Sequence, residues 1–223
     1  MASERAGLGA LYDQTRVRVG VLLAELPADA YGAPVPACPG WTVHDVVAHL
    51  AVLADDVTAG RLTGPPDETR TADQVARGRS RSVAELLEDW ERTAPAMAGV
   101  VTAARMWPAL MDVVSHEHDI RGAVDRPGAR DSDAVVAVVA ALLRLDPPVP
   151  LVVRTEDREV RRGPAADQGG PVLELTTTTW ETLRWRMGRR SRAQLVAMDW
   201  SGDPGPVLDS LTIFGPAAAD LVE

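Results

Sequence analysis

The stretch DVVSHEHDIR, residues 112–121, holds two imidazoles and three carboxylates within ten residues. The chain has four histidines, and the other two, His44 and His49, both lie in one short segment, residues 41–50. Histidines scattered over a surface do not usually gather into two clusters in this way. We therefore expect these two segments to form helices that meet around a metal ion.

Helical spacing selects the donors within the first stretch. Asp112 and His116 are four residues apart and share one helical face, whereas His118 points roughly the opposite way. In residues 41–50, His49 lies at the edge of the apolar stripe and can face the core. Glu117 and His118 remain second choices as ligands, because they lie on other faces of the helix. Ordinary helix capping and surface salt bridges are the alternative interpretation of the whole cluster.

A donor set of His49, Asp112 and His116 leaves a coordination position open for water or substrate. Catalytic zinc sites usually have three protein ligands and one exchangeable ligand, whereas structural sites are closed by four ligands, often thiolates. A single cysteine cannot supply a structural site of that kind. Imidazole and carboxylate also suit Ni²⁺, Fe²⁺ and Mn²⁺, so the donors predict a divalent metal without deciding which one.

Two neighbouring polar residues receive simpler interpretations. His44 lies in the first turn of its predicted helix, where the helix dipole does not favour a protonated imidazole, and we expect it to be solvated. Cys38 stands in a proline-rich loop with no obvious base nearby, so we expect a structural role for it. Asp119 and Arg121 are candidates for supporting or structural roles.

Apolar periodicity predicts helices over residues 8–26, 42–59, 106–124 and 134–145, and another that is capped by Ser80 or Ser82. Thr42 followed by Asp45 resembles a capping box. Residues 60–78 are polar and rich in Pro, Thr and Asp, and are expected to form a loop. After the sequence DPPVP, residues 146–150, strand patterns follow at 151–153, 159–161 and 172–178. The order predicts an α+β protein of two domains, residues 1–147 and 148–223.

Composition excludes several classes of protein. The net charge of −9 argues against sequence-independent binding of nucleic acid, because phosphate contacts require a basic face. No apolar run approaches the length of a membrane span, and the beginning of the sequence has no apolar signal core. With one cysteine and no disulfide framework, the expected location is the cytoplasm.

Two segments together resemble a known family. CPGWTVHDVVAHL, residues 38–50, resembles the PGW-T-x-x-D-x-x-x-H-L signature of the mycothiol-dependent maleylpyruvate isomerases, which belong to the DinB-like metalloenzyme superfamily. Residues 112–123 resemble the second metal motif of that family, an acid and a histidine four apart followed by an aspartate. Residues 183–191 and 211–216 are weakly similar to its C-terminal part, so that the resemblance spans most of the chain.

The resemblance implies a DinB-like four-helix bundle followed by a small sterol-carrier-like α+β domain. It also implies a divalent metal, zinc above the others, held by His49, Asp112 and His116, with Asp112 standing where the isomerases have glutamate. Arg189, after Gly188, matches the Gly-Arg pair of the family and would anchor an anionic substrate as a catalytic residue. Mycothiol would be the thiol cosubstrate.

The resulting functional hypothesis is a metal-dependent, mycothiol-using isomerase or S-transferase that acts on a small electrophilic metabolite. The expected partners are therefore a small-molecule substrate and a low-molecular-weight thiol, with no nucleic acid and no membrane. Two alternatives stay open: a metal-dependent hydrolase on the same bundle, and a non-catalytic small-molecule-binding protein.

Overall fold

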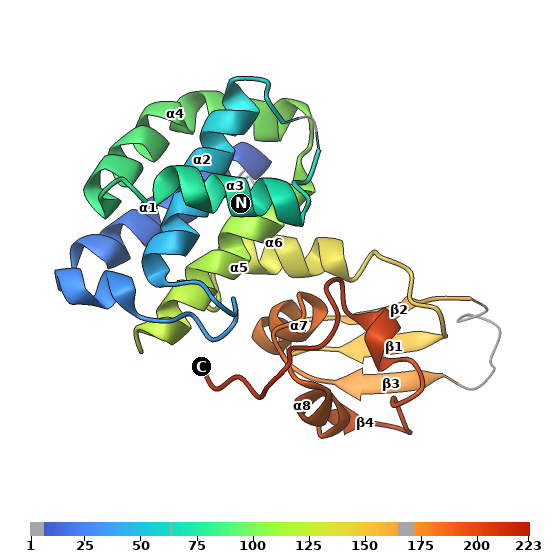
Figure 1. Ribbon diagram of the computed structural model, residues 1–223. Coiled ribbons are helices and arrows are strands. Elements are labelled where there is room, and N and C mark those ends of the chain that lie inside the picture. Colours follow the sequence, from blue (N-terminus) through green and yellow to red (C-terminus); the bar gives the residue numbers. More distant parts are fainter. Residues whose placement is uncertain (1–6, 63, 165–171) are drawn as a thin grey trace. The chain divides into compact units, whose positions relative to one another are not determined.

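The computed structural model describes residues 7–62, 64–164 and 172–223, and the chain divides into two compact units, Met1–Pro127 and Gly128–Glu223. The first unit is helical, and the second combines helices with a small sheet (Figure 1). The expected α+β class with two parts is therefore confirmed. No helix of the described residues combines the length and the apolarity needed to cross a membrane.

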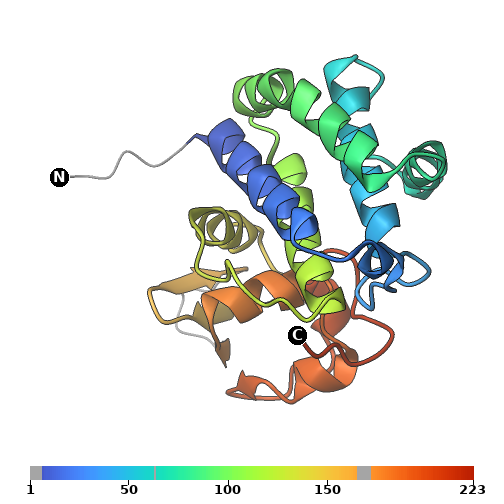
Figure 2. The ribbon, with the colours of Figure 1, turned by 90° about the vertical axis from the view of Figure 1, so that its left-hand side faces the viewer.

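The first unit is built on four long helices: α1 (Leu8–Ala24), α2 (Val43–Thr58), α4 (Val83–Ala103) and α5 (Trp107–Ala123). α1 and α2 each pack against both α4 and α5, which closes a four-helix bundle. The side-by-side course of α1 and α5 can be followed in Figure 2, where they are blue and light green. A short 3₁₀ helix, η1 (Ala28–Gly32), and α3 (Glu68–Gly78) complete the unit.

Side-chain caps explain where two of these helices begin. The Thr42 hydroxyl accepts from the Asp45 backbone N–H at the start of α2, and the Asp45 carboxylate accepts in return from the Thr42 backbone N–H. Ser82 and Glu85 form the same reciprocal pair at the start of α4. Each capping box satisfies backbone donors that the first helical turn cannot pair internally.

The expectation of a loop over residues 60–78 is wrong, because α3 occupies its second half. Asp67 caps this helix by accepting from the Arg70 backbone N–H. α3 lies so close to α2 that a Cβ on Gly78 would come within 2.4 Å of the Ala48 Cβ. Few of its residues are buried, and they include only one large apolar side chain, Val75, which is why apolar periodicity did not predict the helix.

The second unit contains a four-stranded sheet with the order β2-β1-β3-β4. β1 (Leu151–Arg154) pairs antiparallel with β2 (Glu159–Arg162) and parallel with β3 (Leu173–Thr176), and β3 pairs antiparallel with β4 (Asp199–Trp200). The helices of the unit are α6 (Asp133–Leu142), α7 (Thr179–Arg186), α8 (Arg192–Val196) and α9 (Leu208–Leu211). The first three strands lie where the alternating pattern predicted them.

The two units separate before α6, whereas the sequence placed the domain boundary after it, at 147/148. α6 packs against α7. Arg186 of α7 donates from Nη2 to the carbonyl of Leu142, at the end of α6, over 2.9 Å. Burial lowers the pKa of this arginine to about 10. The contact joins α6 to the sheet unit even though α6 follows the bundle helices in the sequence.

Candidate metal centre

Three side chains from two helices meet inside the first unit. His49 comes from α2, and Asp112 and His116 come from α5. The Asp112 carboxylate lies between the two imidazoles, with Oδ2 3.3 Å from His49 Nε2 and Oδ1 3.5 Å from His116 Nε2. One donor atom from each residue lies within 4.8 Å of the other two. The sequence-predicted donors are thus brought together in one place.

The two nitrogen–oxygen separations are close to those expected around a tetrahedral metal ion. Zinc bonds of about 2.0 Å to nitrogen and oxygen separate neighbouring donors by about 3.3 Å. Both imidazoles are buried, whereas 30% of the Asp112 side chain is exposed. Two imidazoles and a carboxylate supply three protein ligands for a divalent ion, the number usual in catalytic sites that keep one exchangeable ligand.

Gln74, from α3, orients the His49 ring. Its Oε1 lies 3.0 Å from His49 Nδ1, and its Nε2 donates to Asp56 Oδ2 over 3.2 Å. Because a carboxylate can only accept, the amide nitrogen faces Asp56 and the amide oxygen faces His49. His49 must then carry its proton on Nδ1, which leaves the Nε2 lone pair directed at Asp112 and available to a metal.

Arginine side chains keep the Asp56 carboxyl ionised. Burial would raise the pKa of this carboxyl, but hydrogen bonds from Arg77, Arg61 and Gln74 outweigh the effect and lower the pKa to about 2. The carboxylate is therefore ionised at every pH above about 3 and keeps the Gln74 amide in one orientation. Gln74 and Arg77 both lie on α3. Because residues 60–78 were expected to form a loop, the sequence did not predict that these two residues support the site.

Replacing Gln74 with methionine is expected to weaken zinc binding by about 10- to 100-fold, the usual cost of losing a partner behind a ligating histidine. Methionine preserves the side-chain length, but its thioether is only a weak hydrogen-bond acceptor for His49 Nδ1–H. Both tautomers of the His49 imidazole then become accessible. Competition with a chromophoric chelator would measure the affinity, and thermal unfolding of the metal-free protein would control for folding. Unchanged affinity in a folded variant would contradict the orienting role.

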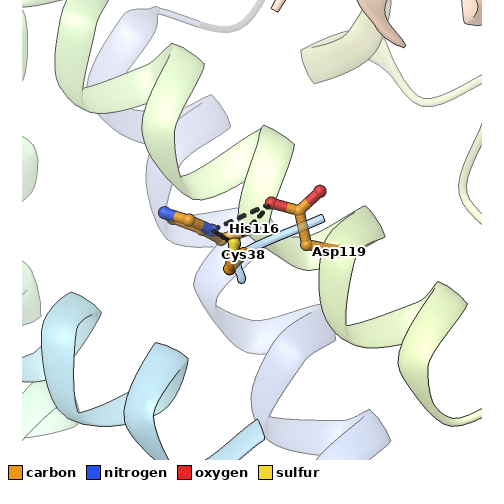
Figure 3. A group of neighbouring side chains, drawn as sticks. All are labelled: Cys38, His116 and Asp119. Atoms are coloured by element: carbon orange, nitrogen blue, oxygen red, sulfur yellow. Dashed lines mark hydrogen bonds and ion pairs between the residues drawn. The ribbon is translucent and has the colours of Figure 1, made fainter. Parts of the chain in front are cut away.

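Asp119 performs the corresponding task for His116. Its Oδ2 lies 3.0 Å from His116 Nδ1, one turn further along α5. The carboxylate accepts a hydrogen bond from His116 Nδ1–H, which leaves Nε2 unprotonated and facing Asp112. The Cys38 thiol lies on the same side of the ring, 3.5 Å from Asp119 Oδ2 and 3.8 Å from His116 Nδ1 (Figure 3). The loop before α2 thus brings Cys38 beside α5, a proximity that the sequence did not predict.

The second-choice ligands lie elsewhere. Glu117 is fully buried and pairs with Arg18 of α1 over 2.7 Å and with Arg121 over 3.0 Å. In the part of the chain that the structure describes, neither Glu117 nor His118 belongs to a group that could hold a metal ion. His44, which was expected to be solvated, instead donates from Nε2 to the carbonyl of Arg81 over 2.7 Å.

Trp41, the tryptophan of the CPGW segment, packs on the two histidine rings. Its ring centroid is 5.4 Å from that of His49 and 6.1 Å from that of His116, and it is nearly stacked on the latter, with 25° between the planes. The indole therefore shields the imidazoles from one side. The sequence contained this residue within the family motif but did not indicate what it contacts.

Arg189 lies in the second unit, directly after α7, and donates from Nη1 to the carbonyl of Met187 over 2.7 Å. The preceding Gly188 has a φ of +76°, and a Cβ there would come within 2.4 Å of the Gly215 carbonyl oxygen. Only glycine suits this turn, which explains the Gly-Arg pair in backbone terms. The catalytic role of Arg189 stays a prediction.

Solved structures resemble the fold of most of the chain, and a family model matches the sequence within its first unit. The solved structure of a histidine-to-alanine variant of a mycothiol-dependent maleylpyruvate isomerase is 15% identical, with a TM-score of 0.56, and the match covers 81% of this chain and 88% of that one. A second structure of such an isomerase is 16% identical, with a TM-score of 0.51 and coverage of 86% and 91%. At these identities the structural likeness establishes the fold.

No curated protein sequence matches the chain. Residues 12–121, which include α2, most of α5 and all three donors, match the family model described as the mycothiol maleylpyruvate isomerase N-terminal domain. These residues of the first unit therefore belong to the family of mycothiol maleylpyruvate isomerase N-terminal domains.

Proposed function

We propose that this protein is a metal-dependent enzyme that uses mycothiol to isomerise a small electrophilic metabolite or to transfer a thiol to it. The observation that carries the proposal is the group of His49, Asp112 and His116, which lies within residues 12–121, the part of the chain that belongs to this family. Family membership supports the use of mycothiol, and the donor group supports the metal.

A bound divalent ion, zinc above the others, would lower the pKa of a thiol at the open position so that the thiolate forms near neutral pH. The chain's own residues prepare the position. His49 and His116 direct their Nε2 atoms towards it, because their Nδ1–H groups donate hydrogen bonds to Gln74 and Asp119. Asp112 supplies a negative charge between the two rings.

The expected reaction on the substrate follows from thiol chemistry. In a cis–trans isomerisation, a thiolate adds to an activated double bond, the resulting single bond rotates, and elimination breaks the carbon–sulfur bond and returns the thiol. In an S-transfer, the carbon–sulfur bond stays and a leaving group departs. Arg189 is our candidate for binding an anionic group of the substrate, as its guanidinium suits carboxylates.

Removing the metal is expected to abolish turnover, and omitting the thiol is expected to do the same. Chelator-treated protein, purified without an affinity tag, would be assayed with mycothiol and maleylpyruvate before and after zinc is restored. Restored activity that depends on both additions supports the proposal. Turnover that needs zinc but no thiol would assign the bundle to metal-dependent hydrolysis, and tight mycothiol binding without turnover of any electrophile would indicate a binding protein.

A further inference from the structure

A second group of donors lies beside the candidate metal centre and shares one residue with it. Its members are Cys38 Sγ, His116 Nδ1 and Asp119 Oδ2 (Figure 3). The nitrogen lies 3.0 Å from the oxygen, and the sulfur lies 3.5 Å from the oxygen and 3.8 Å from the nitrogen. We propose that these three atoms form a separate binding site for a thiophilic divalent cation such as Zn²⁺ or Cd²⁺. The proposal does not depend on mycothiol chemistry at the first group.

The spacing of the three atoms matches a tetrahedral site. A zinc ion with bonds of about 2.3 Å to sulfur and about 2.0 Å to nitrogen and oxygen separates sulfur from each neighbour by about 3.5 Å, and nitrogen from oxygen by about 3.3 Å. Each observed separation lies close to these values. An ion could therefore be bound with side-chain adjustments of a few tenths of an ångström.

The two groups use opposite sides of the His116 ring. Nε2 faces Asp112, and Nδ1 faces Asp119 and Cys38. One ion cannot bond to both nitrogens of a single imidazole, because their lone pairs diverge. Cys38 is thus not a further ligand of the first centre, and an ion that it binds must be a second one, either bridged to the first through the imidazole or competing with it for His116.

The donor types decide which ions would bind. Sulfur is a soft ligand and favours zinc, cadmium and similar ions over Mg²⁺ or Ca²⁺, which prefer oxygen. His116 and Asp119 are almost fully buried, whereas Cys38 is half-buried. Cys38 would bind as a thiolate after releasing its proton. The His116 proton would also leave Nδ1, moving to Nε2 when the first group is empty and being released to solvent when an ion already binds Nε2. Two buried donors and one half-buried donor also suggest that the ion enters from the side of Cys38.

The chain has only one cysteine, which makes the test direct. Cadmium would be titrated into untagged, full-length protein while the ultraviolet thiolate-to-cadmium charge-transfer band is followed. We expect a saturable band in the wild-type protein and its complete loss in Cys38→Ser. Asp119→Asn is expected to weaken the cadmium affinity reported by the band by about 10- to 100-fold, because it replaces a ligand that also orients His116.

Asp112→Asn separates this proposal from the proposed function. It removes a donor of the first group only, so we expect the band and its affinity to persist. Absence of the band from wild-type protein would overturn the second site, as would an Asp119→Asn variant that binds cadmium as tightly as wild type, since Cys38 would then bind alone. Failure of the first group would instead appear as zinc binding by Cys38→Ser protein, which lacks the second site, that adding Asp112→Asn does not change.

Discussion

Replacing Asp112 with asparagine is expected to reduce zinc affinity by at least about 100-fold and to remove turnover. The Asp112 carboxylate lies within 3.5 Å of the Nε2 atoms of both histidines and is the one anion of the donor group. Asparagine keeps the shape of the side chain but removes the negative charge. It can also turn an N–H, which cannot bind a metal, towards the site.

Glutamate at the same position is expected to retain zinc binding, since it preserves the charge and is the acid that the family resemblance implies. Zinc affinity would be measured by chelator competition on Asp112→Asn and Asp112→Glu, each combined with Cys38→Ser so that only the first group can bind the metal. Asp13→Asn serves as a matched control on α1, where the half-exposed carboxylate pairs with Arg16. If asparagine at 112 bound zinc as tightly as wild type, the metal would have to lie elsewhere.

Replacing Glu117 with alanine is expected to lower the free energy of unfolding by about 3 kcal/mol, and to leave the zinc affinity of the folded protein unchanged. The carboxylate is completely buried and holds Arg18 and Arg121, which belong to different helices. Its removal leaves two partly buried guanidinium groups without their shared anion. The cost is moderated because Arg18 retains partial exposure and its bond to Thr15.

Urea unfolding of the metal-free protein would measure the loss. Glu91→Ala, at an exposed position of α4, should change stability by no more than about 0.5 kcal/mol and serves as the control. A loss of zinc affinity in folded Glu117→Ala, with little change in stability, would contradict the structural role. It would also restore Glu117 as a candidate ligand.

Local rules predicted much of the bundle. The capping residues Thr42 and Ser82 start α2 and α4, and the spacing of four residues places Asp112 and His116 on one face of α5. These features depend only on neighbours within one helical turn. The histidine clusters then selected His49 as the partner from a second helix, and the structure brings the three side chains together.

The supporting groups could not be predicted in this way. Gln74 belongs to a helix that buries little apolar surface, so its sequence resembles a loop, and its partners His49 and Asp56 come from α2. Cys38 reaches His116 across 78 residues of sequence. α6 belongs to the second unit because it packs on α7, although it follows the bundle helices in the sequence.

The sequence by itself predicted the four long helices of the bundle, the capping box of α2 and the three candidate donors, because each depends on residue type and on spacing within a turn. Only the tertiary structure decided which side chains contact and orient those donors. It paired Glu117 with two arginines rather than with the donor group, placed Gln74 behind His49, and set Cys38 beside Asp119. Such contacts arise from the packing of segments distant in sequence, which no local pattern encodes.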